Sequence, residues 1–192
     1  MRHRHRRLHR KLNMPSATTN LRIRPATQND LQGLRLLYND IIDAMDASQW
    51  HAQWRKDGYP SNTELENAIL KGELYVAILS DSIVAAMILN HAFNEGYRTV
   101  PWQITCNDEE ILCIHTLGVS PHIQRCGIAS AMLGYAVQRA RAMGCRCIRL
   151  DVIENNRPAD LLYTRYGFNF CGTHHLHYDS VSAAFNMYEY LL

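Results

Sequence analysis

A glycine-containing turn joins an apolar strand pattern to a helical pattern in this 192-residue chain. The strand pattern runs from Ile111 to Val119, and the turn is Gln124-Arg125-Cys126-Gly127-Ile128-Ala129. The first N–H groups of a helix lack internal partners and lie at the positive end of its dipole, so this junction predicts a phosphate site. Gly127 would let the main chain come close to such an anion. The spacing alone is common in loop-to-helix turns, so its meaning depends on its context.

Three further stretches accompany this turn. Leu117-Gly118-Val119 precedes it, and Asn156-Arg157-Pro158-Ala159 and Leu162-Tyr163-Thr164-Arg165-Tyr166-Gly167-Phe168 follow it. Together the four resemble the acetyl-CoA-binding core of the GNAT acetyltransferase superfamily, whose signature is (Gln/Arg)-x-x-Gly-x-(Gly/Ala), then Asn-x-x-Ala-x-x-Leu-Tyr-x-x-x-Gly-Phe. Every signature position is matched. The resemblance implies an acetyl-CoA-dependent N-acetyltransferase that transfers the acetyl group directly to a primary amine of a small molecule or a protein.

The resemblance also implies how the coenzyme binds, mainly through backbone groups. The pantetheine arm would lie along the fourth strand, with main-chain contacts from Leu117, Gly118 and Val119, and the Val119 N–H would polarise the thioester carbonyl. Asn156 would contact the coenzyme arm, although an asparagine before a helix is also a common cap. The pyrophosphate would be held by the turn, whose residues are Gln124, Arg125, Cys126, Gly127, Ile128 and Ala129.

Tyr163 occupies the tyrosine position of the family, four residues before Gly167-Phe168. There its hydroxyl would reach the sulfur of the departing coenzyme A. A phenol with a pKa of about 10 is protonated at neutral pH and suits this general-acid role. Tyr166, three residues further along the helix, is expected to pack or to reach solvent.

The general base is less clearly marked. Many family members place a glutamate on the fourth strand, whereas Glu109 and Glu110 precede the apolar run here. His115 lies on this strand, and an ordinary imidazole pKa of about 6.5 suits removal of the amine proton, directly or through water. A strand histidine is also often a hydrogen-bonded core residue, and both roles stay open. Cys113 on the same strand face is expected to pack.

The remaining patterns predict a single α/β domain over residues 21–192. The expected fold is a mixed sheet of about seven strands, splayed between strands 4 and 5, with about four helices. Strands are expected at 21–24, 74–79, 83–89, 111–119, 147–152, 168–178 and 185–191. Helices are expected from the Thr27 cap to 45, from the capping box at Ser61 to 72, over 124–143, and from Pro158 to 166.

The formal net charge of +2 hides an asymmetry. Residues 1–13 hold six arginines and lysines and no acid, so the remainder carries a net charge of −4. We expect residues 1–20 to form a basic arm without fixed structure. Composition favours an extended start before Met14 over an arm that contacts nucleic acid. There is neither a secretory signal pattern nor an apolar run of transmembrane length, so no membrane partner is expected.

Six cysteines show neither a paired zinc spacing nor a Cys-x-x-Cys motif, which fits a reducing, cytoplasmic compartment. His174, His175 and His177 could suggest a metal, but no nearby ligand set completes a tetrahedral site. We therefore expect no metal cofactor.

The acceptor is not named by any motif. By family resemblance, the segment 47–59 helps to shape its pocket, and the candidate acceptor-binding residues are Tyr38, Trp50 and Trp54. The acidic balance of residues 14–192 favours a cationic amine. Transfer of a longer acyl group stays open, as does the oligomeric state. The alternative function is a non-catalytic acyl-CoA-binding module whose basic arm docks on nucleic acid.

Overall fold

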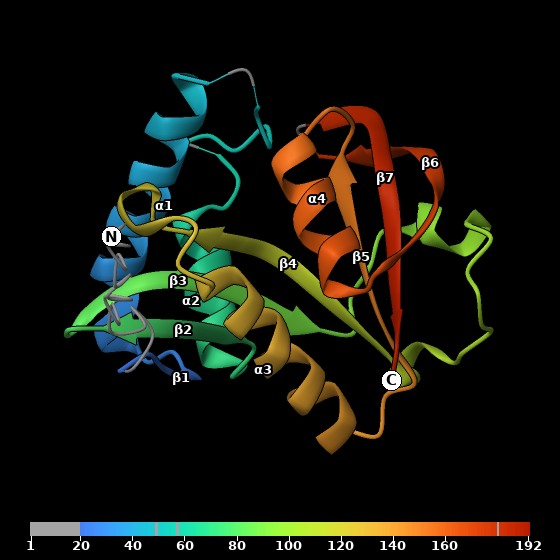
Figure 1. The fold of residues 1–192 in the computed structure, drawn as a ribbon, viewed down its shortest axis with the longest axis horizontal. Coiled ribbons are helices and arrows are strands. Elements are labelled where there is room, and N and C mark those ends of the chain that lie inside the picture. Colours follow the sequence, from blue (N-terminus) through green and yellow to red (C-terminus); the bar gives the residue numbers. More distant parts are fainter. Residues whose placement is uncertain (1–19, 49, 57, 180) are drawn as a thin grey trace, which may run out of the picture.

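The computed structural model of the protein describes residues 20–48, 50–56, 58–179 and 181–192. The basic segment 1–13 lies outside these residues, so the prediction of a basic arm is untested. In the part of the chain that is described, no helix has both the length and the apolar character needed to cross a membrane. A single sheet with helices on both faces makes up the fold (Figure 1).

Seven strands form this sheet in the order β1-β2-β3-β4-β5-β7-β6. Only β4 and β5 run parallel, and every other neighbouring pair is antiparallel. The strands are β1 Arg22–Pro25, β2 Leu74–Leu79, β3 Ser82–Asn90, β4 Ile111–Val119, β5 Cys147–Ile153, β6 Asn169–Tyr178 and β7 Val181–Leu191. The predicted mixed sheet is confirmed. The last strand begins at Val181 instead of 185, because β6 and β7 stay paired up to Tyr178 and Val181.

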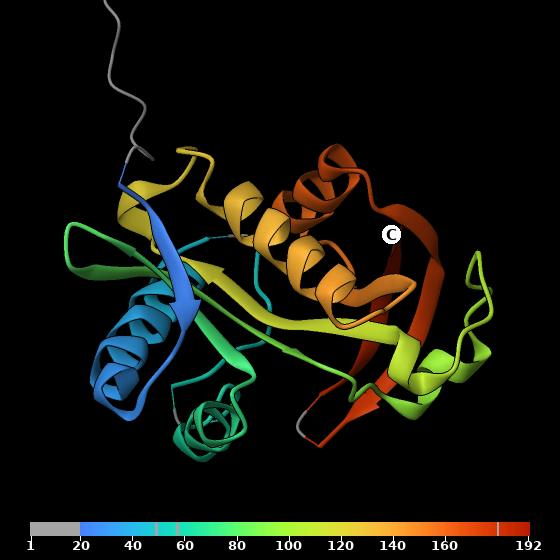
Figure 2. The same cartoon turned by 90° about the horizontal axis from the view of Figure 1, so that it is seen from below.

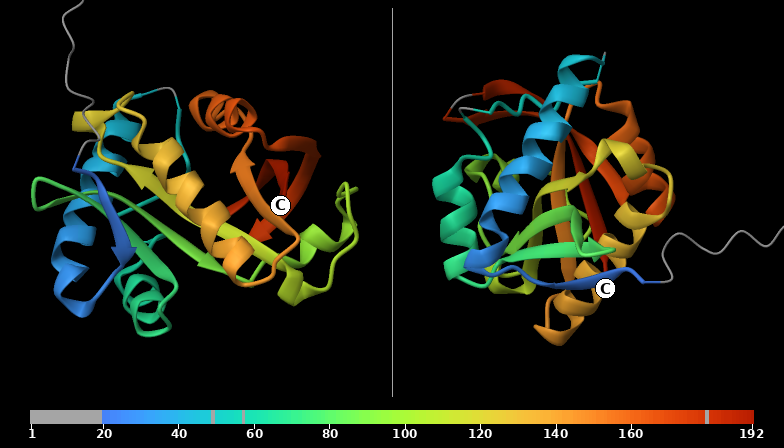
Figure 3. Two further views of the ribbon diagram at one scale, coloured as in Figure 1. Left: turned by 60° about the horizontal axis from the view of Figure 1, so that its bottom comes forward. Right: turned by 90° about the vertical axis from the view of Figure 1, so that its left-hand side faces the viewer.

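Four α-helices flank the sheet in the described residues: α1 Leu31–Asp46, α2 Asn62–Leu70, α3 Ile128–Ala142 and α4 Arg157–Tyr166. Helices α1 and α2 pack on one face of the sheet, over β2 and β3. Helix α3 packs on the opposite face, over β3 and β4, and α4 lies on that same face beside α3 and β6 (Figure 2). Figure 3 shows α3 in front of the sheet in its left view and α1 in front of the sheet in its right view. The sheet therefore separates two sides of the molecule that differ in their covering elements.

Two helix starts carry the capping side chains that the sequence predicts. The Ser61 N–H donates to Glu64 Oε2 at 2.7 Å, and the Glu64 N–H donates to Ser61 Oγ at 3.1 Å. Thr27 and Asp30 form a similar box at a short 3-10 turn that leads into α1. Each box satisfies N–H groups that have no partner inside the helix.

Helix α3 begins at Ile128, not at Gln124 as predicted. Arg125 has φ of 62° and Gly127 has φ of 79°, both in the left-handed region, which a right-handed helix cannot contain. Residues 124–127 therefore form a turn ahead of the helix. The loop before α3 is therefore longer than predicted, and its backbone lies outside the helical hydrogen-bond pattern.

The connection between β3 and β4, residues 91–110, is held to the sheet by a buried ion pair. Arg149 Nε of β5 lies 2.9 Å from Glu189 Oε1 of β7. Glu189 Oε2 accepts from the Gln103 N–H at 2.8 Å, and Arg149 Nη2 donates to the Ile104 carbonyl at 2.9 Å. The guanidinium also lies over the Trp102 ring, 4.4 Å from its centroid. This connection packs on the sheet face opposite α3 and α4, beside β5 and β7.

The parallel strands β4 and β5 are paired only at their beginnings, from Ile111↔Cys147 to Cys113↔Arg149. Beyond this point they diverge (Figure 1), as the family resemblance implied. The pairing of β4 with β3 shifts register just after His115, where Thr116 has φ of 50°. A bulge of this kind bends its strand. The Tyr38 hydroxyl of α1 stabilises it by donating to the Thr116 carbonyl at 2.9 Å.

Candidate active site

A cavity of about 900 Å³ opens where β4 and β5 separate. Asn156, Ala159 and Tyr163 line it from the side of α4. Residues on the opposite side of the sheet include Trp54 and His115. Because both sides contribute, two molecules can enter from opposite faces and meet between the strands.

The turn before α3 presents unpaired backbone donors on the α4 side of the sheet. Among the described residues, no acceptor is found for the N–H groups of residues 124–129. Gln124, Arg125 and Gly127 are exposed, and Cys126, Ile128 and Ala129 are more buried. Gly127 has no heavy atom within 4 Å of where a Cβ would stand, so its backbone is open to a ligand. The turn can accept an anion at the helix start.

The backbone of β4 presents a further donor to the gap. The Ser120 N–H donates to the Val84 carbonyl of β3 at 2.8 Å. Successive N–H groups of a strand point to opposite edges, so the Val119 N–H faces the gap toward β5. Leu117 lines the cavity. Gly118 allows α1 to pack closely against β4, because a Cβ at this position would lie 2.7 Å from Ile41 Cδ1 of α1.

Tyr163 and Asn156 reach the cavity from α4. The Tyr163 side chain is 7% exposed, and its ring packs against Phe168 and Tyr188. Its hydroxyl has no hydrogen-bond partner among the described residues, and burial, with a smaller effect from Asp151, raises the pKa of Tyr163. Asn156 stands at the helix N-cap position, but its side chain makes no capping hydrogen bond, so the amide is free for a ligand.

Tyr166 lies outside this cavity. Its ring packs against Phe168 and Tyr190, with centroids 6.1 and 5.8 Å away. The two tyrosines of α4 thus differ in surroundings, and only Tyr163 lines the cavity.

His115 is held so that one ring nitrogen is free. Nε2 lies 2.9 Å from Asn90 Oδ1 and 3.0 Å from the Ala92 carbonyl oxygen. Asn90 Nδ2 donates to Glu73 Oε2 at 3.0 Å, and this contact orients the amide. With two acceptors at Nε2, the neutral ring carries its proton there, and Nδ1 is left as an acceptor. Burial lowers the pKa of His115, opposed by the Asp151 charge, so the ring is neutral at neutral pH.

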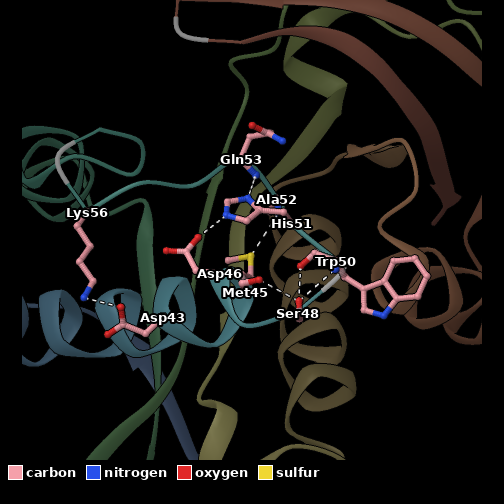
Figure 4. A network of polar contacts seen from close by, with 9 residues as sticks. All are labelled: Asp43, Met45, Asp46, Ser48, Trp50, His51, Ala52, Gln53 and Lys56. Carbon is pink, nitrogen blue, oxygen red and sulfur yellow. Dashed lines mark hydrogen bonds and ion pairs between the residues drawn. The ribbon is translucent and has the colours of Figure 1, made fainter.

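The segment after α1 is anchored to the end of that helix (Figure 4). His51 Nε2 lies 2.7 Å from Asp46 Oδ1, and His51 Nδ1 accepts from the Gln53 N–H at 2.8 Å. Lys56 Nζ lies 2.6 Å from Asp43 Oδ1. These contacts set the course of residues 50–56, which supply part of the cavity wall.

The three predicted acceptor-binding residues have different places. Trp54 lines the cavity and packs edge-on against Tyr38, with centroids 5.6 Å apart. Tyr38 is 3% exposed, does not line the cavity and supports the Thr116 bulge. Trp50 does not line it either, and its indole points away from the contacts at the end of α1 (Figure 4). The structure thus brings only Trp54 to the cavity.

Sequence reasoning missed Asp151 of β5. Its Oδ2 accepts from the Tyr97 hydroxyl at 2.6 Å and from the Tyr178 hydroxyl at 2.7 Å. An acid within the apolar run Leu150-Asp151-Val152 was a signal that could have indicated it. Further missed lining residues are Tyr59, Glu64, Phe93, Tyr178, Asp179 and Phe185. Except for Glu64 of the capping box, these come from segments without a motif.

In the described ranges, no group of three His, Cys, Asp or Glu side chains is placed to hold a metal ion. His175 and His177 are neighbours, with ring centroids 5.0 Å apart, and His177 Nδ1 lies 2.9 Å from Ser182 Oγ. All six cysteines are free thiols.

Comparison with known families bears on this site. Residues 39–168 match the acetyltransferase (GNAT) family, which is more than half of the chain. The chain belongs to this family. As a GNAT acetyltransferase it is an acyltransferase, and the family implies acetyl-CoA as the acyl donor. No curated protein matches the sequence.

Solved structures share the fold of this GNAT acetyltransferase. A GNAT family acetyltransferase from Streptococcus agalactiae has a TM-score of 0.77 and 20% identity, covering 91% of this chain and 96% of its own. PaiA N-acetyltransferase from Thermoplasma acidophilum, in complex with coenzyme A, has a TM-score of 0.67 and 16% identity. The match covers 90% of this chain and 99% of that protein. Ribosomal-protein-alanine N-acetyltransferase from Brucella melitensis has a TM-score of 0.63 and 18% identity. The match covers 89% of this chain and 99% of that protein. At these identities the likeness concerns the fold.

Proposed function

We propose that this GNAT acetyltransferase is an N-acetyltransferase that transfers the acetyl group of acetyl-CoA directly to a primary amine. The observation that carries the proposal is the cavity between β4 and β5, which has a proton acceptor and a proton donor on opposite sides. His115 Nδ1 is free on one side, and the Tyr163 hydroxyl is free on the other. Amine acylation by a thioester needs such a pair.

The donor is assigned to the side of α3 and α4. The N–H groups of the turn 124–129 would bind the pyrophosphate, and Asn156 would contact the coenzyme arm. The arm would then extend along the unpaired edge of β4 past Leu117, with its thioester carbonyl accepting from the Val119 N–H. The acceptor would enter from the opposite side, past Trp54.

The transfer proceeds by attack of the neutral amine nitrogen on the acetyl carbon, which forms the C–N bond. The Val119 N–H stabilises the negative charge on the carbonyl oxygen. His115 Nδ1 takes the proton from nitrogen as the C–S bond breaks, and Tyr163 protonates the departing sulfur. The imidazolium then loses its proton and the tyrosinate regains one. The products are the acetamide and free coenzyme A.

The raised pKa of Tyr163 is compatible with this role. It keeps the hydroxyl protonated through neutral pH, so the acid is ready in the resting enzyme. A thiolate that forms in the same buried cavity also has a raised affinity for protons, because burial disfavours its charge.

The test is release of free coenzyme A from acetyl-CoA across a panel of polyamines, amino acids, aminoglycosides, arylalkylamines and peptides. With the most active amine, we expect Tyr163→Phe to lower kcat by about 100-fold, because the departing sulfur loses its proton donor. Tyr166→Phe is the matched control and should stay within about twofold of the wild type, since Tyr166 packs outside the cavity.

Equal kcat values for Tyr163→Phe and the wild type would remove Tyr163 as the acid and keep the enzyme. Acetyl-CoA binding in calorimetry without turnover of any amine would contradict amine acetylation. Such a result would favour an acyl-CoA-binding module instead.

A further inference from the structure

The side chains that line the cavity give it an acidic charge balance. Three carboxylates line it: Glu64 from α2, Asp151 from β5 and Asp179 after β6. No lysine or arginine appears among its described lining residues. The aromatic lining residues are Trp54, Tyr59, Phe93, Tyr163, Tyr178 and Phe185. A cavity with acids and aromatic rings and without a lysine or arginine attracts cations and repels carboxylates.

Asp151 is the best placed of the three acids. The hydroxyls of Tyr97 and Tyr178 both donate to its Oδ2, at 2.6 and 2.7 Å. Such short O–H contacts stabilise an ionised carboxylate and fix its orientation. Oδ1 receives no hydrogen bond from any described residue. This oxygen is therefore available to a donor that enters the cavity.

The charge of Asp151 also reaches both catalytic candidates. It adds to burial in raising the pKa of Tyr163, and it opposes burial in the pKa of His115. An independent feature of the same cavity is the unpartnered hydroxyl of Tyr163, a residue that is 7% exposed. Asp151 thus lies near the place where bonds change, and it is not part of a distant acidic patch.

We propose that Asp151, assisted by Glu64 and Asp179, selects a cationic acceptor, namely a primary amine that carries no carboxylate beside the amino group. Asp151 Oδ1 binds the ammonium form, which loses one proton to water before attack. His115 then accepts the second proton, which leaves nitrogen as the C–S bond breaks. An α-amino acid would bring its own carboxylate toward the three acids and would be disfavoured. This inference rests on the proposed N-acetyltransferase function and narrows its acceptor class.

The test compares amines with their carboxylated counterparts, such as tyramine with tyrosine and cadaverine with lysine. For every pair that shows turnover, we expect kcat/KM for the carboxylate-free amine to exceed that of the amino acid by about 100-fold, the scale of like-charge repulsion inside a protein. Asp151→Asn should reduce this ratio by about 10-fold, because one of the three repelling charges is lost. Its coenzyme A Kd should stay unchanged.

Asp81→Asn is the matched control, since it removes the same charge from the exposed β2–β3 turn. Asp81 has φ of 61°, a conformation that asparagine tolerates, so rates and ratio should remain those of the wild type. Thermal melting of Asp151→Asn verifies that the isosteric variant is folded.

Equal kcat/KM within each pair would overturn the selection by charge and leave the N-acetyltransferase function standing. An equal loss for both members of a pair in Asp151→Asn would also overturn it, because Asp151 would then serve the chemistry and not the charge of the acceptor. Absence of turnover with the whole amine panel would instead overturn the proposed function itself.

Discussion

His115 and Tyr163 depend on their surroundings for the roles that their side chains can perform. Asn90 and the Ala92 carbonyl engage Nε2 of His115, and this leaves Nδ1 as the basic atom. The Tyr163 ring is fixed by Phe168 and Tyr188, so its unpartnered hydroxyl keeps one position. Proton transfer depends on such positioning before it depends on pKa.

The pH dependence of the reaction tests the role of His115. Burial lowers the pKa of His115 below its ordinary value of about 6.5, so the base stays neutral at neutral pH and is lost only in more acidic solution. We expect kcat/KM to fall as pH decreases, with a midpoint below about 6.5. His115→Gln should remove this limb and lower kcat by about 100-fold. A midpoint above the ordinary histidine value, or a limb that persists in the variant, would exclude His115 as the base.

At the scale of elements, β4 and the turn after it carry most of the proposed donor site. The Thr116 bulge and the loss of pairing after Cys113 leave the Val119 N–H facing an open gap. The left-handed residues Arg125 and Gly127 then place the start of α3 after an exposed turn. A regular strand followed directly by a helix would bury these donors in secondary structure.

Gly127 provides a test of the turn with a close control. Both Gly127 and Gly144 have left-handed φ, 79° and 76°, and neither has a heavy atom within 4 Å of a Cβ position. Each change to alanine should therefore cost about 1 kcal/mol of unfolding free energy from backbone strain. Only Gly127→Ala places a methyl group where the anion approaches, so its coenzyme A Kd should rise by about 10-fold. Calorimetry that gives the same Kd for both variants would contradict a phosphate site at this turn.

At the scale of the whole molecule, the sheet would keep the proposed donor and acceptor on opposite sides until they meet in the gap. Helices α3 and α4 cover the donor side, and α1 with the connection 91–110 covers the acceptor side (Figure 2). That connection supplies Phe93 to the cavity and Tyr97 to Asp151. Its attachment to β5 and β7 therefore matters for the acceptor site.

The ion pair between Arg149 and Glu189 is the interaction to test at this scale. The two side chains are 7% and 0% exposed, and they also hold backbone groups of residues 103 and 104. Glu189→Ala should lower the unfolding free energy by about 3–5 kcal/mol, because it leaves a buried charge uncompensated. Urea unfolding measures this loss. The double variant Arg149→Met, Glu189→Leu should recover most of it, and a single variant that costs under about 1 kcal/mol would show that the pair is not structural.

Local patterns in the sequence predicted the order of the elements and the family. The capping residues Ser61 and Glu64, the turn around Gly127 and the signature from Asn156 to Phe168 are each read within a few residues of chain. Their physical causes are equally local: unsatisfied N–H groups at helix starts, left-handed backbone at glycine, and apolar alternation in strands. The predicted fold is confirmed, while the roles of His115 and Tyr163 stay predictions.

Tertiary structure decided what distant segments do together. Asp151 becomes a candidate acceptor-binding group only because Tyr97 and Tyr178, 54 and 27 residues away in the chain, donate to the same oxygen. Tyr38 is a predicted acceptor-binding residue. Its hydroxyl donates instead to the Thr116 carbonyl at the bulge, because α1 packs it against β4. Helix and strand periods determine which face a side chain takes, but not which remote side chain it meets there. The sequence by itself therefore determined the family, the element order and the donor signature, and only the folded chain decided the charge and shape of the acceptor cavity.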